Sequence, residues 1–204
     1  VSRPSSPASA TGTSPSLSAA LNDVRFSGKR LMVADKPFFM RGIRHTGMPL
    51  HVLNDAMFNT LFVDETVSEM VIKDASQKGF KLVPSLEPRR EELPTRMNRF
   101  LGSESVLAWL IGGNLDADRF DQARLFANEI RQGDPSRVLI ADVWDNFLAY
   151  DRSFDNTLIG THRWPLSTSL ELDNYRKWLS HRRNLTRNSF AWTWIQTHSQ
   201  EWFM

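Results

Sequence analysis

The 204-residue sequence contains no cysteine, which excludes a disulfide framework, a thiolate zinc site and a cysteine nucleophile. No apolar run approaches the roughly 18 residues needed to cross a bilayer, so we expect no membrane span. Charge of one sign is not in excess either: 25 Lys and Arg residues face 23 Asp and Glu residues, a formal net charge of +2. Such a balance gives no indication of a nucleic-acid partner. The composition is that of an ordinary globular protein.

Residues 1–22 have few large apolar side chains and are rich in Ser, Pro, Ala and Thr. A segment of this kind cannot bury enough apolar surface to offset the entropy lost on ordering, so we expect a disordered linker there. The first residues lack the basic start and apolar core of a secretory signal peptide. We expect residues 23–204 to form one domain, and we favour an extracellular or periplasmic location over a cytoplasmic one.

From residue 24 onwards the sequence predicts regular structure, beginning with a small hairpin over residues 24–33. Apolar runs then alternate with amphipathic stretches, which is the pattern of strands separated by helices. Continuously apolar strands are typical of parallel sheets that helices cover. Strands are expected at residues 38–45, 58–63, 80–83, 106–111, 138–141, 157–160 and 190–195, and helices at residues 49–57, 66–78, 91–101, 118–132 and 170–185.

Two α/β architectures fit this alternation, a (β/α)8 barrel and an open doubly wound sheet. Polar clusters follow the strands all along the chain, as expected for a barrel, whose active site collects the carboxyl ends of all strands. An open sheet would concentrate such clusters at one switch point. Gly112 and Gly113 lack the spacing and the lysine of a phosphate-binding loop. We therefore predict a TIM-barrel-like (β/α)8 fold that follows the small hairpin.

The length of the sequence bears on the completeness of this barrel. A typical (β/α)8 barrel takes about 250 residues, and 180 residues follow Val24. We therefore expect the eighth strand and helix to be missing, with the chain truncated just after Met204. The domain over residues 23–204 is predicted to be part of a larger chain.

Four motifs carry a resemblance to a known family. They are Lys36–His45, which opens the first predicted barrel strand, Phe58–Thr60, Trp109–Asn114 and Asp134–Arg137. In this order, over most of residues 24–196, they resemble the catalytic barrels of glycoside hydrolase family 2 and its clan A relatives. The resemblance implies a barrel that hydrolyses O-glycosidic bonds of an oligo- or polysaccharide and needs no cofactor.

The same resemblance implies that both usual catalytic residues are absent. The family uses two glutamates, one after the Asn of the fourth strand and one on the seventh strand. Here Leu115 follows Asn114, and the second position falls on Gln196. A retaining pair needs one carboxylic acid to protonate the leaving oxygen and one carboxylate to attack the sugar, and neither Leu nor Gln can do this.

Other carboxylates at predicted strand ends could replace the missing pair, and each has a second interpretation. Asp116 is the nearest to the family position, but it could equally cap the helix expected from Asp118. Asp64 ends the second predicted barrel strand, where an acid is also ordinary before a helix. Glu87 lies after the third strand. Asp142 follows the fifth, where loop capping is the alternative. The candidate catalytic residues are Asp116, Glu87, Asp64 and Asp142.

Residues of two kinds at the strand ends could bind a saccharide. Polar side chains would bond sugar hydroxyls, and aromatic rings would stack on the C–H faces of pyranoses. The candidates are Arg44, His45, Asn114, Trp144, His162, Arg163, Trp164, Trp194, Gln196 and His198. His45, His162 and His198 could instead ligate zinc, but no short ligand spacing supports a metal site, and we predict none.

Two functions therefore stay open at this stage. The first is hydrolysis of O-glycosidic bonds with carboxylates other than the family pair. The second is a catalytically inactive module that binds carbohydrate or serves as a scaffold in a larger protein. A metal-dependent hydrolase built on the three histidines is a third, minor alternative. The expected partner in the first two cases is a carbohydrate, with no nucleic acid and no cofactor.

Overall fold

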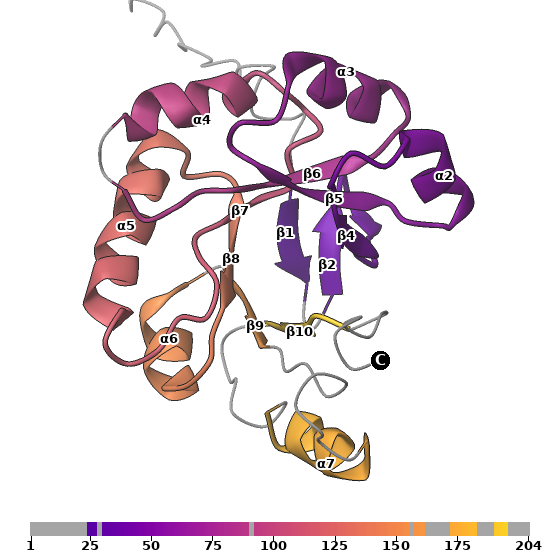
Figure 1. Ribbon diagram of the computed structural model, residues 1–204. Coiled ribbons are helices and arrows are strands. Elements are labelled where there is room, and N and C mark those ends of the chain that lie inside the picture. The colour runs from indigo at the N-terminus through magenta and orange to yellow at the C-terminus, as the bar shows by residue number, and fades with distance from the viewer. Residues whose placement is uncertain are drawn as a thin grey trace, which may run out of the picture.

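The computed structural model describes residues 24–27, 30–89, 92–155, 157–161, 172–182 and 190–195. In this part of the chain, strands β1, β2 and β3 form a small antiparallel sheet, and β4 to β10 form a seven-stranded parallel sheet in chain order. The large sheet curls around a common centre with α2 to α6 on its outside (Figure 1). The predicted α/β fold is confirmed, since this curled sheet corresponds to an incomplete (β/α)8 barrel. The predicted linker over residues 1–22 lies outside the described residues.

The elements follow the predicted alternation of strands and helices. The strands are β1 Val24–Ser27, β2 Arg30–Val33, β3 Lys36–Pro37, β4 Gly42–Arg44, β5 Thr60–Asp64, β6 Lys81–Ser85, β7 Ala108–Leu110, β8 Val138–Asp142, β9 Thr157–Thr161 and β10 Phe190–Thr193. The helices are α2 Leu50–Asp55, α3 Glu69–Gln77, α4 Leu93–Leu101, α5 Phe120–Gly133, α6 Phe147–Ser153 and α7 Leu172–Arg182. No helix among the described residues is long and apolar enough to cross a membrane.

The first barrel strand is shorter than predicted, because the side chain of Asn59 forms hydrogen bonds with the backbone of residues 39 and 41. The Asn59 side chain accepts a hydrogen bond from the Arg41 backbone N–H (2.8 Å) and donates one to the Phe39 carbonyl oxygen (2.9 Å). Residues 38–41 therefore stay outside the ladder, and β4 begins at Gly42.

Pro84 was expected to end the third barrel strand, and this prediction is wrong. β6 continues through Pro84 to Ser85, and Pro84 pairs with Val63 of β5. On the other side of β6, the backbone N–H groups of Leu82 and Leu86 donate to residues at β7, but Pro84 between them has no N–H to donate. The ladder between β6 and β7 is correspondingly short, with the register pair Ser85 and Leu110 and one isolated bridge.

Helix α6 was not predicted from the sequence. Its seven residues are too few for a clear periodicity, and it begins after Asn146, whose φ of 54° is left-handed. The helix is held by aromatic packing: the Tyr150 ring lies 5.4 Å from Phe154 and 5.1 Å from Phe120, between ring centroids. The contact with Phe120, 30 positions away in the sequence, cannot be predicted from the periodicity of the helix itself.

Side chains alternate between two cores along each barrel strand. On β5, Phe62 points into the barrel, whereas Leu61 and Val63 pack outward against the helices. The inward core also receives side chains from the small antiparallel sheet, which packs against one end of the barrel. The buried inward residues are Val24, Phe62, Val83, Leu107, Ala108, Leu110, Val138, Ile140 and Leu158.

The inside of the barrel is crossed by aromatic rings from strands far apart in the sequence. The Trp194 ring, directly after β10, lies 4.7 Å from Phe62 of β5, and the Trp192 ring of β10 lies 5.8 Å from Phe62, between centroids. Two glycines leave room for these rings: a Cβ on Gly42 would lie 2.5 Å from the Phe62 ring, and one on Gly160 would lie 2.0 Å from Trp192. Trp192 and Trp194 both pack against the inward core.

Replacing Gly160 by Ala should destabilise the protein because the new Cβ collides with the Trp192 ring. Overpacking of this kind costs about 1–3 kcal/mol, measurable by chemical denaturation. Gly102→Ala is the matched control, since no atom lies within 4 Å of a Cβ built there. The loss should shrink in a Trp192→Leu background. An equal loss in both backgrounds would show that the ring is not the cause.

A buried polar network ties β7 to the segment before β8. The Asp134 carboxylate accepts hydrogen bonds from the Trp109 indole N–H (2.9 Å) and the Ser136 hydroxyl (2.8 Å), and it pairs with Arg137. The Arg137 guanidinium also donates to the carbonyl oxygen of Val106 (3.1 Å). Burial acts to raise the pKa of Asp134, but these hydrogen bonds and the Arg137 charge outweigh it and hold the pKa below its ordinary value.

The lowered pKa of Asp134 predicts a pH-dependent contribution to stability. Because the folded-state pKa lies below the unfolded value, the contribution is full above the ordinary Asp pKa and is lost as the pH falls through the folded-state pKa. Asp134→Asn should cost about 3–5 kcal/mol at neutral pH, since it leaves Arg137 buried without its anion. Denaturation of both proteins from pH 7 to 2.5 tests this. A gap that stays constant throughout would contradict the assignment.

Candidate active site at the barrel mouth

The carboxyl ends of β4 to β10 form the mouth of the barrel, where active sites of this architecture lie. Asp142 is the last residue of β8, and by the alternation of side chains along the strand it lies on the same inward face as Val138 and Ile140. It is 4% exposed, so its carboxylate is enclosed at the mouth. Its Oδ2 would be 3.6 Å from a Cβ on Gly113, an ordinary contact distance, so this glycine lies directly beside the carboxylate.

Asp64 is the second acid on the inward face of a barrel strand, two residues after Phe62 on β5. Its register partner on β6 is Ser85, which the sequence analysis did not identify as a rim residue. Asp64 is exposed, whereas the next residue, Glu65, is held by arginines. Of this acidic pair, Asp64 is therefore the carboxylate open to a ligand.

The other two predicted catalytic acids have local structural partners. Asp116 accepts a hydrogen bond from the Arg119 backbone N–H (3.1 Å) and so closes the turn before α5, which begins at Phe120. The N-cap of α5 is Arg119 and has no side-chain cap, so Asp116 closes the preceding turn and is not the expected helix cap. The Glu87 side chain is 69% exposed, and its Oε2 lies 3.1 Å from Nε of Arg89.

Tyr150 reaches the same turn from α6, and its hydroxyl donates to the Asp116 carbonyl oxygen (2.8 Å). Burial, followed by the charges of Asp116 and Asp145, raises the pKa of Tyr150 to about 12. The phenol therefore stays protonated at physiological pH and remains a hydrogen-bond donor. Its partner is a backbone carbonyl of the turn.

The predicted sugar-binding residues divide into those that the structure describes and those that it does not. Arg44 ends β4 and is exposed, and His45 is half-buried behind it. Asn114 is exposed with a left-handed φ of 53°, Trp144 is 47% exposed, and Trp194 is half-buried inside the barrel. His162, Arg163, Trp164, Gln196 and His198 lie outside the described residues.

A small hollow of about 380 Å³ lies beside the mouth, between the loops after β6 and β7 and the start of α5. Leu86 and Leu115 are among its apolar residues, and Glu87, Arg119 and Gln122 contribute polar groups. Arg119 and Gln122 were not identified from the sequence, because neither belongs to a motif. Leu115 is 2% exposed and packs in the core.

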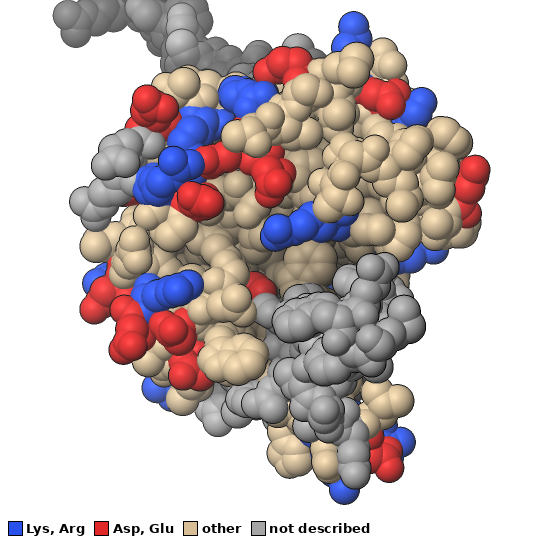
Figure 2. Space-filling view, in the orientation of Figure 1, with Lys and Arg blue, Asp and Glu red and all other residues tan. Residues whose placement is uncertain are grey.

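Charge is unevenly distributed on the face shown in Figure 2. Acidic and basic side chains gather over α4 and α5, whereas the visible wall of the central hollow is mostly uncharged.

Within the described residues, no three His, Asp or Glu side chains are grouped so that they could hold a metal ion. Of the three histidines considered as zinc ligands, this statement covers only His45.

Comparison with known proteins supports the fold. No protein-family model and no curated protein matches the chain. A family 2 glycoside hydrolase, the beta-galacturonidase from Eisenbergiella tayi bound to galacturonate, aligns with a TM-score of 0.62 at 12% identity over 86% of this chain. A putative beta-galactosidase from Bacteroides fragilis gives 0.62 at 9% over 84%. A family 5 mannosidase from Rhizomucor miehei gives 0.55 at 10% over 82%.

These similarities establish a glycosidase-like barrel fold and, at such low identity, nothing finer. The aligned region spans 38% of the galacturonidase chain, 30% of the galactosidase chain and 70% of the mannosidase chain. This chain therefore corresponds to about a third of the two larger proteins.

Proposed function

We propose that the mouth of this barrel binds a saccharide. The proposal is supported by a fold shared with solved glycoside hydrolases, which act on carbohydrates, and by the placement of sites at this end of such barrels. One observation carries it: the enclosed Asp142 carboxylate at the end of β8 lies two residues from the exposed Trp144 ring.

Asp142 and Trp144 supply the two kinds of contact that a sugar needs. A carboxylate accepts hydrogen bonds from two hydroxyl groups, and it is strongest as an acceptor where water is excluded. An exposed indole offers a flat apolar face for the C–H groups of a pyranose ring. Gly113 lies next to the carboxylate and also lines the small hollow, so a sugar bound in the hollow would lie close to Asp142.

Other predicted residues would complete the site around this pair. Arg44 and Asn114 would bond outer hydroxyls, His45 would do so from a more enclosed position, and Trp194 would form part of the floor. Five further residues are proposed from the sequence alone: His162, Arg163, Trp164, Gln196 and His198. The mouth would then present hydrogen-bonding groups on several sides of a sugar ring.

Hydrolysis of an O-glycosidic bond is the second candidate function, with Asp142 and Asp64 as the carboxylate pair. It is favoured by the inward parity of both acids at the ends of β5 and β8. Asp116 and Glu87 are less suited, because one closes a turn and the other pairs with Arg89. The buried Leu115 favours the alternative, an inactive module that binds carbohydrate or serves as a scaffold.

Replacing Trp144 by Ala should weaken saccharide binding on a glycan array, because the stacking face is lost. Aromatic stacking on a ligand ring contributes on the order of 1 kcal/mol or more, so affinity should fall roughly tenfold. Leu148→Ala is the matched control, since Leu148 is a similarly exposed apolar residue on the neighbouring helix α6. Equal affinity of Trp144→Ala and the unmodified protein, or no binding by either, would reject the proposal.

Product analysis on the glycan that binds tests hydrolysis separately. Asp142→Asn and Asp64→Asn should each abolish turnover while glycan binding is weakened but still measurable, since an amide can accept a hydrogen bond but can neither protonate a leaving group nor attack. Asp116→Asn and Glu87→Gln serve as controls that keep turnover. Binding without turnover in the unmodified protein would establish the inactive module. Turnover that survives Asp142→Asn would remove Asp142 from the mechanism.

A further inference from the structure

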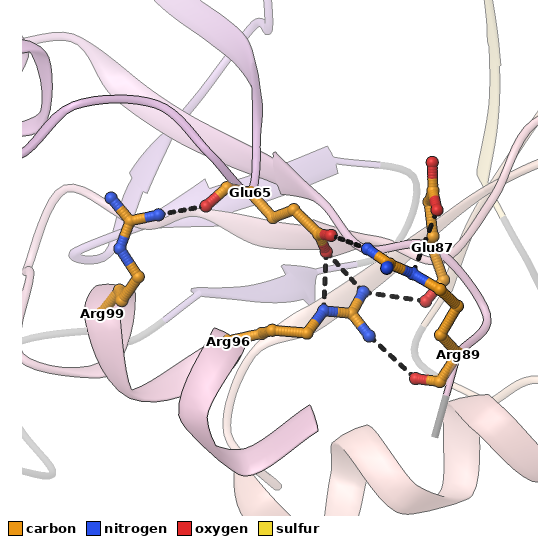
Figure 3. A network of polar contacts seen from close by, with 5 residues as sticks. All are labelled: Glu65, Glu87, Arg89, Arg96 and Arg99. Atoms are coloured by element: carbon orange, nitrogen blue, oxygen red, sulfur yellow. Dashed lines mark hydrogen bonds and ion pairs between the residues drawn. The ribbon is translucent and has the colours of Figure 1, made fainter. Parts of the chain in front are cut away.

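A buried arginine on α4 joins two loops of the mouth. The Arg96 side chain is 10% exposed, and its Nε donates to Oε2 of Glu65 at 2.7 Å, with Nη2 paired to the same oxygen. Glu65 lies directly after β5, and its side chain is 13% exposed. The two charges are therefore paired in a largely water-free position behind the rim (Figure 3).

The same guanidinium also holds the loop after β6. Its Nη1 donates to the carbonyl oxygen of Arg89 (2.8 Å), and its Nη2 donates to the carbonyl oxygen of Glu87 (2.9 Å). A planar fork of five N–H groups can make such bonds in several directions at once, which an ammonium group cannot. One side chain of α4 thus fixes the distance between the loops after β5 and β6.

Two further arginines complete this clamp. Arg99, one turn along α4, donates to the carbonyl oxygens of Glu65 and Val67. Arg89 pairs with the Glu65 carboxylate from the other side and also with Glu87. Glu65 is held both by its main-chain carbonyl and by its side chain.

Fixing Glu65 also fixes the direction of the residue before it. Asp64 precedes Glu65 and has the inward parity of Phe62, so the peptide between Asp64 and Glu65 sets where the Asp64 carboxylate points. Ser85, the register partner of Asp64, lies two residues before Glu87, whose carbonyl the clamp also holds. Both rim residues therefore depend on contacts made on the outer side of the sheet.

The energetics favour a geometric role for this clamp over a purely stabilising one. A buried ion pair costs several kcal/mol of desolvation per ion, and apolar residues of similar size usually stabilise a core as well or better. What an apolar side chain cannot supply is three directed hydrogen bonds and an ion pair that together join two loops. The desolvation cost makes Arg96 a poor choice for stability alone, whereas its directed contacts hold the two loops in a defined geometry.

We propose that Arg96, assisted by Arg99, is a positioning residue of the mouth. It holds the loops after β5 and β6 at a fixed separation and thereby directs Asp64 and Ser85 toward a bound saccharide. The effect on the loops is independent of any ligand, whereas the effect on binding rests on the proposed saccharide site.

Amide hydrogen exchange tests the loop geometry without a ligand. In Arg96→Met, amides of residues 64–67 and 86–89 should exchange roughly tenfold faster or more, because both loops lose their anchor. Arg124→Met is the matched control, since Arg124 pairs with Asp121 on the exposed face of α5. Unchanged exchange in both loops of a folded Arg96→Met protein would overturn the proposal.

Arg96→Lys keeps the test decisive if Arg96→Met fails to fold. The ammonium group can pair with Glu65 but cannot also reach both carbonyl oxygens of the β6 loop. Residues 86–89 should therefore exchange faster, while residues 64–67 stay close to the unmodified protein. A uniform increase over the whole chain would indicate loss of stability only and would contradict a positioning role.

A double-mutant cycle on saccharide affinity tests the link to Asp64. Arg96→Lys should weaken binding of the best glycan on the array several-fold, and the same change should have little effect in an Asp64→Asn background. Additive losses would show that Arg96 does not act through Asp64. Absence of binding by the unmodified protein would reject the saccharide site, whereas the exchange results would still decide the loop geometry.

Discussion

The packing of Phe62 against Trp192 and Trp194 is the contact on which the curled sheet depends. These rings come from β5, from β10 and from the residue after β10, and they pack against one another across the space that the strands enclose. Gly42 and Gly160 have no side chain where the rings pass, so the strands can approach them. Residues that alternate to the same inward side farther along the strands reach the mouth. The position of Asp64 and Asp142 follows from this alternation.

The described acids of the barrel differ in their partners and in their burial. Asp134 is buried against Arg137 far from the mouth, Glu65 is held by Arg89 and Arg96, and Asp116 closes a turn. These three carboxylates make contacts that stabilise the fold. Asp142 lies enclosed at the mouth beside Gly113, which also lines the small hollow. The different contacts of these four acids show that a position near a strand end does not by itself identify a catalytic or ligand-binding acid.

Patterns that depend on neighbours in sequence predicted much of this molecule. Continuous apolar runs predicted the seven parallel strands, and the expected helix at residues 66–78 corresponds to α3, which Ser68 caps. Features set by distant residues were not predictable. The Asn59 amide shortens β4 from across the sheet, and α6 depends on aromatic contacts. The role of Arg96 had no signal in the sequence, because its partners lie 7 to 31 positions away and none forms a motif with it.

The proline within β6 has a mechanical consequence for the whole sheet. Because Pro84 offers no donor to β7, β6 and β7 share one register pair, fewer than any other neighbouring strands of the large sheet in the described part of the chain. The small hollow lies between the loops that follow these two strands. Side-chain packing therefore has a larger share in joining β4 to β6 with β7 to β10 than backbone pairing has at this boundary.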